Sequence, residues 1–157
     1  MSYALQPLLR IRTMREDRAS GELSAARREL VAAEEALEAR RHDLEAYEKT
    51  KEERRDRIYD AIMGRAVSRD QIDLVNEGVA RIDEEGALKA DNVARAESER
   101  KKREEDTVTA RHNLAMATRN RMKIDELKSV WLAAAAAEEE YRAESELEDF
   151  VVRKPEI

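Results

Sequence analysis

LSAARRELVAAEEALEARRHDLEAY, residues 23–47, places a leucine at every seventh position. These are Leu23, Leu30, Leu37 and Leu44, and alanines follow three residues after the first two. Apolar residues at alternating steps of three and four gather on one narrow stripe of a helix. A narrow stripe is typical of a helix that packs along a second helix. The stretch therefore predicts a coiled coil.

The same spacing continues to both sides of this stretch and predicts a first helix over residues 7–63. Pro7 suits a first helical turn, where its missing N–H is not needed. At a rise of 1.5 Å per residue, the helix would be about 85 Å long. Its stripe comprises Leu9, Arg12, Glu16, Ala19, Leu23, Ala26, Leu30, Ala33, Leu37, Arg40, Leu44, Tyr47, Lys51, Arg54, Ile58 and Ala61.

Residues 64–68 form the predicted turn. Gly64 suits a helix end in the left-handed conformation. Ser68 followed by Gln71 matches a capping box, in which each side chain accepts a hydrogen bond from a free backbone N–H at a helix start. Helices joined by so short a segment usually fold back as an antiparallel hairpin.

A second helix is predicted over residues 69–149, followed by a C-terminal tail at 150–157 that would extend past the start of the first helix. The second helix carries an equally unbroken stripe, which would face the first. It comprises Ile72, Val75, Val79, Ile82, Gly86, Lys89, Val93, Ala96, Arg100, Arg103, Thr107, Ala110, Leu114, Ala117, Arg121, Ile124, Lys128, Trp131 and Ala135.

The two stripes predict an all-α fold, a long two-helix antiparallel coiled-coil hairpin forming a single domain over residues 1–157. The position of the turn sets Tyr47 opposite Gly86, where a missing side chain leaves room. Arg100 and Arg103 would face the acids Glu29, Glu34 and Glu35. The alternative is a parallel dimer of extended chains. The short capped turn favours the hairpin, which we expect to be a monomer.

Composition excludes several classes of protein. Charged residues make up 42% of the chain and aromatic residues 4%, which is typical of long helices rather than of sheets. A net charge of −6 argues against a general nucleic-acid binder. The absence of cysteine excludes disulfides and thiolate metal sites. We found no membrane-spanning stretch and no signal peptide, so we expect a cytoplasmic location.

Catalytic and metal chemistry is not expected. There is no glycine-rich phosphate loop and no recognisable Ser/His/Asp arrangement. We place the two histidines, His42 and His112, on solvated faces without a metal. The basic run ERKKREED, residues 99–106, has acids on both sides. This pattern predicts a solvated, salt-bridged helix face rather than a nucleic-acid site. We therefore expect no cofactor, no metal and no enzymatic activity.

Two regions are candidates for partner binding. In LLRIRTMREDRA, residues 8–19, four arginines alternate with apolar residues: Arg10, Arg12, Arg15 and Arg18. This stretch could dock an acidic partner, or simply pack on Trp131 and Leu127. The second region lies near the turn, where aromatic and apolar residues are rimmed by bases: Tyr47, Tyr59, Ile62, Leu74 and Val75, with Lys51, Arg54, Arg55 and Arg57. Some of these, Ile58 and Val75 first, would instead fill the core beside the turn.

The two ends of the chain resemble a known family. LRIRTMREDRASGEL at residues 9–23, KIDELKSVWL at 123–132 and EEEYRAESELEDF at 138–150 resemble the YscO family of type III secretion stalk proteins, relatives of the flagellar export protein FliJ. The resemblance implies a hairpin stalk that links the hexameric export ATPase to the cytoplasmic ring of the export gate. It also implies a peripheral position at the inner-membrane secretion apparatus of a Gram-negative bacterium, with secretion chaperones as further partners.

Residue roles follow from this resemblance. Arg10, Arg12, Arg15 and Arg18 would face the ATPase. The gate-binding group would be Tyr47, Lys51, Arg54, Arg55, Tyr59, Leu74 and Asn76, placed by region. Two other hypotheses remain open from the residues alone: a generic coiled-coil tether or adaptor, and a nucleic-acid accessory protein.

Overall fold

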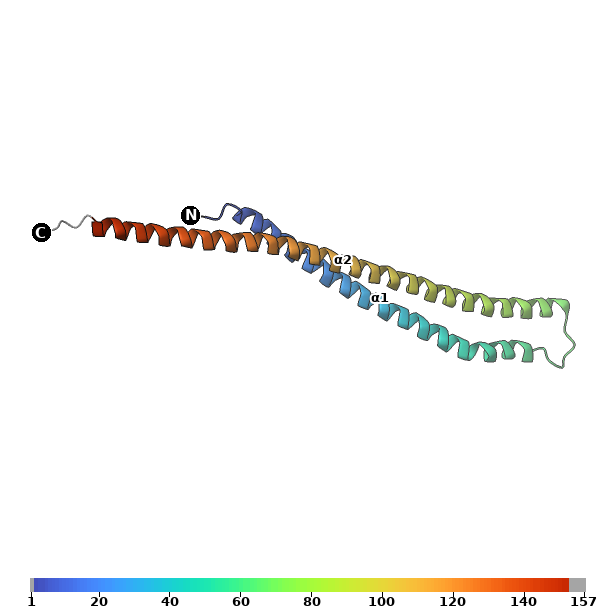
Figure 1. The fold of residues 1–157 in the computed structure, drawn as a ribbon. Helices are drawn as coiled ribbons and strands as arrows, with labels where there is room; N and C mark the ends of the chain where they lie inside the picture. Colours follow the sequence, from blue (N-terminus) through green and yellow to red (C-terminus); the bar gives the residue numbers. More distant parts are fainter. Residues whose placement is uncertain (1, 153–157) are drawn as a thin grey trace. The chain divides into compact units, whose positions relative to one another are not determined.

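The computed structural model describes residues 2–152 and contains two long helices, α1 (Gln6–Asp60) and α2 (Arg69–Val152), of 55 and 84 residues (Figure 1). The described residues contain no β-strand. The prediction of an all-α two-helix antiparallel hairpin is confirmed. Contacts divide the chain into two compact units. Unit one is Met1–Leu23 with Ala110–Ile157, and unit two is Ser24–Thr109.

The turn between the helices forms as expected. Gly64 has a φ of 71°, which an L side chain rarely adopts, so glycine is required there. The backbone N–H of Ser68 donates to Gln71 Oε1 over 2.9 Å, and the N–H of Gln71 donates to Ser68 Oγ over 3.3 Å. This reciprocal pair is the predicted capping box, and it sets the start of α2.

α1 ends at Asp60 rather than at Met63, the expected end. The reason lies in the last turn, which tightens before Gly64. The N–H of Ile62 bonds to the carbonyl of Tyr59 over 3.0 Å, a three-residue step in place of the four-residue step of an α-helix. At the other end, α1 starts at Gln6, so Pro7 is its second residue.

α2 continues to Val152, past the expected end at residue 149. Residues 150–152 of the expected tail are therefore helical, because no helix breaker occurs before Pro155. The rest of that tail, residues 153–157, lies outside the described residues.

Unit two shows the predicted packing of one stripe against the other. Leu37 and Tyr47 of α1 are buried, as are Ile82 and Thr107 of α2. A Cβ on Gly86 would lie 3.1 Å from Cε1 of Tyr47, which confirms the predicted register. Arg103 also pairs across the helices with Glu29, at 2.9 Å, as expected. Arg100 differs, since it pairs with Glu97 and Glu104 of its own helix.

Unit one has a thinner core. Leu9, Ala19 and Leu23 of α1 are buried along the predicted stripe. The stripe of α2 is half-buried there, and Arg121 occupies one of its positions. Arg121 donates to Glu16 of α1 over 2.6 Å, and this hydrogen bond raises the pKa of the guanidinium. At this stripe position an ion pair, rather than apolar packing, therefore joins the two helices.

Candidate partner-binding surfaces

The N-terminal arginines lie on α1 within unit one. Arg10, Arg15 and Arg18 are exposed, whereas Arg12 is half-buried. Arg18 pairs with Glu22 one turn later at 3.2 Å, and both side chains remain largely in solvent. Such exposed pairs are weak and exchange readily. Three of the four guanidinium groups are therefore accessible to a partner.

Arg12 and Arg15 border a shallow groove of about 230 Å³ between α1 and α2. Its other walls are Asn113, Met116, Ala117 and Asn120. The Nε of Arg12 is buried and makes no hydrogen bond within the described residues. A buried N–H without a hydrogen-bond partner carries a cost in free energy.

The N-terminal end of unit one packs through a residue that sequence reasoning missed. The ring of Tyr3 lies 5.4 Å from that of Trp131, and its hydroxyl donates to the carbonyl of Ile124 over 3.4 Å. Leu127, expected to share this contact, is instead 51% exposed. Tyr3 precedes the helix and lies outside its periodic stripe, so no spacing rule could place it.

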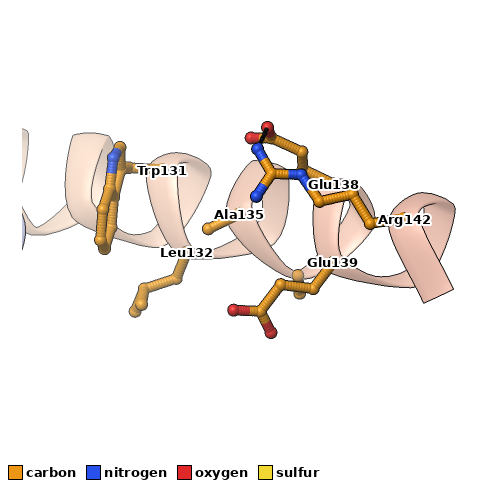
Figure 2. Close-up of a pocket in the computed structure, with 7 residues that line it drawn as sticks. Trp131, Leu132, Ala135, Glu138, Glu139 and Arg142 are labelled. Atoms are coloured by element: carbon orange, nitrogen blue, oxygen red, sulfur yellow. Dashed lines mark hydrogen bonds and ion pairs between the residues drawn. The ribbon is translucent and has the colours of Figure 1, made fainter. Parts of the chain in front are cut away.

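α2 carries a second open groove where it passes the start of α1. Figure 2 shows Trp131, Leu132 and Ala135 close together on α2, with Arg142 beside Glu138 farther on. Arg142 and Glu138 form an ion pair. The groove has a volume of about 440 Å³ and mixes apolar and acidic walls.

Near the turn, the structure separates the predicted group into buried and exposed members. Tyr47 is only 6% exposed, and its hydroxyl donates to the carbonyl of Ile82. Arg54 and Lys89 lie over its ring, 5.6 and 5.7 Å from the centroid. Tyr47 is thus a packing residue of the helix pair, and its side chain offers a partner almost no surface.

The three basic members of the predicted gate-binding group, Lys51, Arg54 and Arg55, form ion pairs across the helices. Arg54 lies 3.1 Å from Glu85, and Lys51 lies 3.8 Å from Asp83. Arg55 also pairs with Asp83. These contacts occupy part of each basic group, so they form a charged rim rather than free cations.

Tyr59, Leu74 and Asn76 are exposed. Tyr59 is 41% exposed and Leu74 66%. Met63 and Ile72, neither of them among the predicted site residues, are also exposed apolar side chains beside the turn. Met63 lies off the predicted stripe, two residues after Ala61, and this offset is the sequence signal that could have identified it. Ile72 is a stripe position, expected to face the first helix, but the structure leaves it 43% exposed. These exposed side chains beside the turn are candidates for an interaction surface.

Two negative findings apply to the described part of the chain. Within residues 2–152, no helix combines the length and the apolar character needed to cross a membrane. The same residues contain no cluster of three or more His, Cys, Asp or Glu side chains that could hold a metal ion.

Comparison with known proteins places the chain in a family. The family model described as "Type III secretion protein YscO" matches residues 5–153. No curated protein sequence matches the chain significantly. A solved structure, described as that of a putative YscO homolog from Chlamydia trachomatis, superimposes with a TM-score of 0.75 at 19% identity. That match covers 96% of this chain and 92% of the other. With the family model matching nearly the whole length, the chain belongs to the YscO family of type III secretion proteins.

Proposed function

We propose that this protein is the central stalk component of a type III secretion export apparatus. In this role it links the hexameric export ATPase to the cytoplasmic ring of the export gate and so supports protein export. The observation that carries the proposal is the YscO family match over residues 5–153. The two-helix hairpin fold supports it, because a stalk needs an extended element with separate surfaces for two partners.

The ATPase-facing surface in this proposal is the N-terminal set of arginines, Arg10, Arg12, Arg15 and Arg18. Three of them are exposed, and Arg12 borders a groove with an unpaired N–H. Guanidinium groups bind carboxylates through paired hydrogen bonds, and complementary charge speeds docking. An acidic surface inside the ATPase ring is the partner that this arrangement suits.

The gate-facing surface lies beside the turn. Its contact residues are Tyr59, Leu74 and Asn76, which are exposed. Lys51, Arg54 and Arg55 form the charged rim, while Tyr47 supports the surface from within the helix pair. Apolar anchors surrounded by polar groups are the usual design of a protein-binding hot spot.

The stalk acts without chemistry of its own and needs no cofactor. One chain serves as the working unit, bound peripherally on the cytoplasmic side of the inner-membrane apparatus of a Gram-negative bacterium. Secretion chaperones are further partners in this proposal. Two findings support the proposal. The family is described as one of type III secretion proteins, and the chain shares its fold with the structure of a putative YscO homolog.

Calorimetry with the purified chain and the purified cytoplasmic ring of the host's export gate tests the proposal. We expect saturable binding that weakens about tenfold or more when Tyr59 and Leu74 are both changed to alanine. Both side chains are exposed, so the helix content should not change. The matched control is Leu88→Ala with Arg95→Ala, two exposed positions of α2 in the same unit.

Three results decide the outcome. Binding that is lost with the Tyr59 and Leu74 variant but kept with the control supports the gate surface. If the variant with Tyr59 and Leu74 changed binds the gate as well as the wild type does, the proposed gate surface is wrong, but the stalk function still stands. A chain that binds neither the gate nor the export ATPase contradicts the stalk proposal itself and leaves the alternative of a generic coiled-coil tether.

A further inference from the structure

α2 carries a second stripe in unit one, on a face that α1 does not cover. Its positions again alternate by steps of four and three, and all but Asn120 are exposed. Exposed Met116, Leu127, Val130 and Tyr141 supply its large apolar side chains. The full set is Met116, Asn120, Lys123, Leu127, Val130, Ala134, Ala137 and Tyr141.

The geometry of this outer stripe is that of a coiled-coil seam. It extends over more than three heptads, or about 38 Å of helix. At its centre, Leu127 and Val130 border an open groove of about 530 Å³ with Lys123, Glu126 and Ser129. Because α1 packs on the other stripe, a helix from another molecule can lie along this one.

The spacing suits a second copy of the same helix in antiparallel orientation. The steps read the same from both ends, so every stripe position of one copy meets a stripe position of the other. Met116 faces Tyr141, a favourable contact between sulfur and an aromatic ring. Leu127 faces Val130 at the centre. A two-fold axis between these two positions generates the whole interface.

Charge selects this antiparallel orientation over a parallel one. The segment Glu138–Asp149 has seven acids and one base, Arg142, which already pairs with Glu138. The other end of the stripe is basic, with Arg119 and Lys123 on α2 and with Arg12 and Arg15 in the adjacent groove. A parallel pair would bring the acidic ends together. An antiparallel pair brings each acidic end against a basic one.

Two specific contacts follow from the register. Arg119 of one copy faces Glu140 of the other at a flanking position of the seam, and the symmetry makes this contact twice. One turn beyond Tyr141, Glu144 reaches the groove that contains Arg12. Arg12 and Arg15 border this groove, so the carboxylate lies beside their positive charge.

We propose that the free protein forms an antiparallel dimer with a second copy of itself through the outer stripe of α2. The dimer covers Arg12 and Arg15, so a chain that uses these arginines to bind another protein must first separate from its copy. The inference rests on the outer stripe and its charges, and it does not depend on the proposed stalk function.

Sedimentation velocity on the full-length chain over a wide concentration range tests the dimer. We expect a monomer–dimer equilibrium in which Arg119→Glu and Glu140→Arg each weaken dimerisation about tenfold, because each brings like charges together twice. The two variants mixed together should form a mixed dimer with near wild-type affinity, since both contacts then pair opposite charges again. The double variant should recover dimerisation in the same way.

A matched pair of leucines separates the outer stripe from a general surface effect. Leu127 and Leu132 lie on the same helix and are each 51% exposed, but only Leu127 belongs to the stripe. Leu127→Asp should abolish the dimer, and Leu132→Asp should leave it unchanged, with helix content the same in both. A monomer at all concentrations overturns the proposal. The proposal is also overturned if Arg119→Glu and Glu140→Arg leave the dimerisation affinity unchanged. Equal effects of Leu127→Asp and Leu132→Asp on dimerisation would overturn it as well.

Discussion

The ring of Tyr47 lies against the backbone of α2 at Gly86, so closely that a Cβ there would be 3.1 Å from Cε1. Arg54 and Lys89 lie 5.6 and 5.7 Å from the ring centroid, and the hydroxyl of Tyr47 donates to the carbonyl of Ile82. The ring has little freedom to move away. Gly86 therefore sets the local separation of the two helices.

Replacing Gly86 with alanine should lower the free energy of unfolding by about 1 kcal/mol. Alanine gains about 1 kcal/mol over glycine in a helix, but overpacking costs about 1–3 kcal/mol. Gly21→Ala is the control, because nothing lies within 4 Å of that position and the substitution should stabilise. Chemical denaturation followed by circular dichroism measures both. Equal stabilisation by the two variants would show that the ring moves freely.

Leu37 is the second most buried apolar side chain of the helix pair, at 4% exposure. Leu37→Ala should lower the free energy of unfolding by about 2 kcal/mol. This value is at the lower end of the range observed when a buried leucine is replaced with alanine, because a two-helix core can close partly around the cavity. Leu88→Ala, at a position 58% exposed, should change it by less than about 0.5 kcal/mol. Denaturant midpoints of the two variants provide the measurement. Similar losses at both positions would contradict the assignment of the core.

The capping box gives a third prediction. Ser68→Ala should lower the free energy of unfolding by about 1 kcal/mol, because the N–H of Gln71 loses its acceptor at the start of α2. Ser20 lies exposed within α1, where Ser20→Ala should stabilise slightly through helix propensity. Thermal unfolding compares the two. A destabilised Ser20→Ala together with an unchanged Ser68→Ala would overturn the role of the cap.

Asp43 and Lys89 form an ion pair across the helices at 2.9 Å. The hydrogen bond from Lys89, with its charge, holds the pKa of the Asp43 carboxyl below its ordinary value of 3.8. A lowered carboxyl pKa stabilises the fold above pH 3.8, and that stability is lost as the pH falls through the folded-state pKa. The hydrogen bond from Arg100 likewise lowers the pKa of the Glu97 carboxyl, with the same consequence for stability.

Lys89→Met should therefore raise the pKa of the Asp43 carboxyl, which NMR titration of the side chain measures directly. The loss of stability on acidification should then be shallower in this variant. Lys101→Met, at an exposed lysine of the same helix, serves as the comparison and should leave Asp43 unchanged. An Asp43 titration that is the same with and without Lys89 would reject the pair as the cause.

The arginines proposed to face the ATPase give the fifth prediction. Arg15→Glu with Arg18→Glu should abolish binding to the export ATPase and impair secretion, because the exchange presents like charge to an acidic partner. Both side chains are exposed, so the helix content should stay the same. Arg27→Glu with Arg28→Glu reverses the same number of exposed charges farther along α1. Equal secretion by both double variants would contradict the assignment of the N-terminal surface.

The amino-acid order alone was enough to predict the stripe along which each helix packs and the alignment of the two helices. The alternating steps of three and four identified Leu9, Leu37 and Ile82 as stripe positions, and all are buried. The position of the turn placed Tyr47 against Gly86 and Arg103 against Glu29. These features could be predicted because helical periodicity and chain reversal depend only on residue order and fixed helix geometry.

The availability of the candidate side chains to a partner could not be predicted in this way and depends on the folded structure. Tyr47 is enclosed by α2, while Tyr59 and Leu74 stay exposed, although all three belonged to one predicted surface. Arg100 pairs within its own helix while Arg103 reaches across. Periodicity assigns a residue to a face of the helix. Burial and the choice of ion-pair partner depend on side-chain rotamers and on separations of a few ångströms between the helices, which no spacing rule contains.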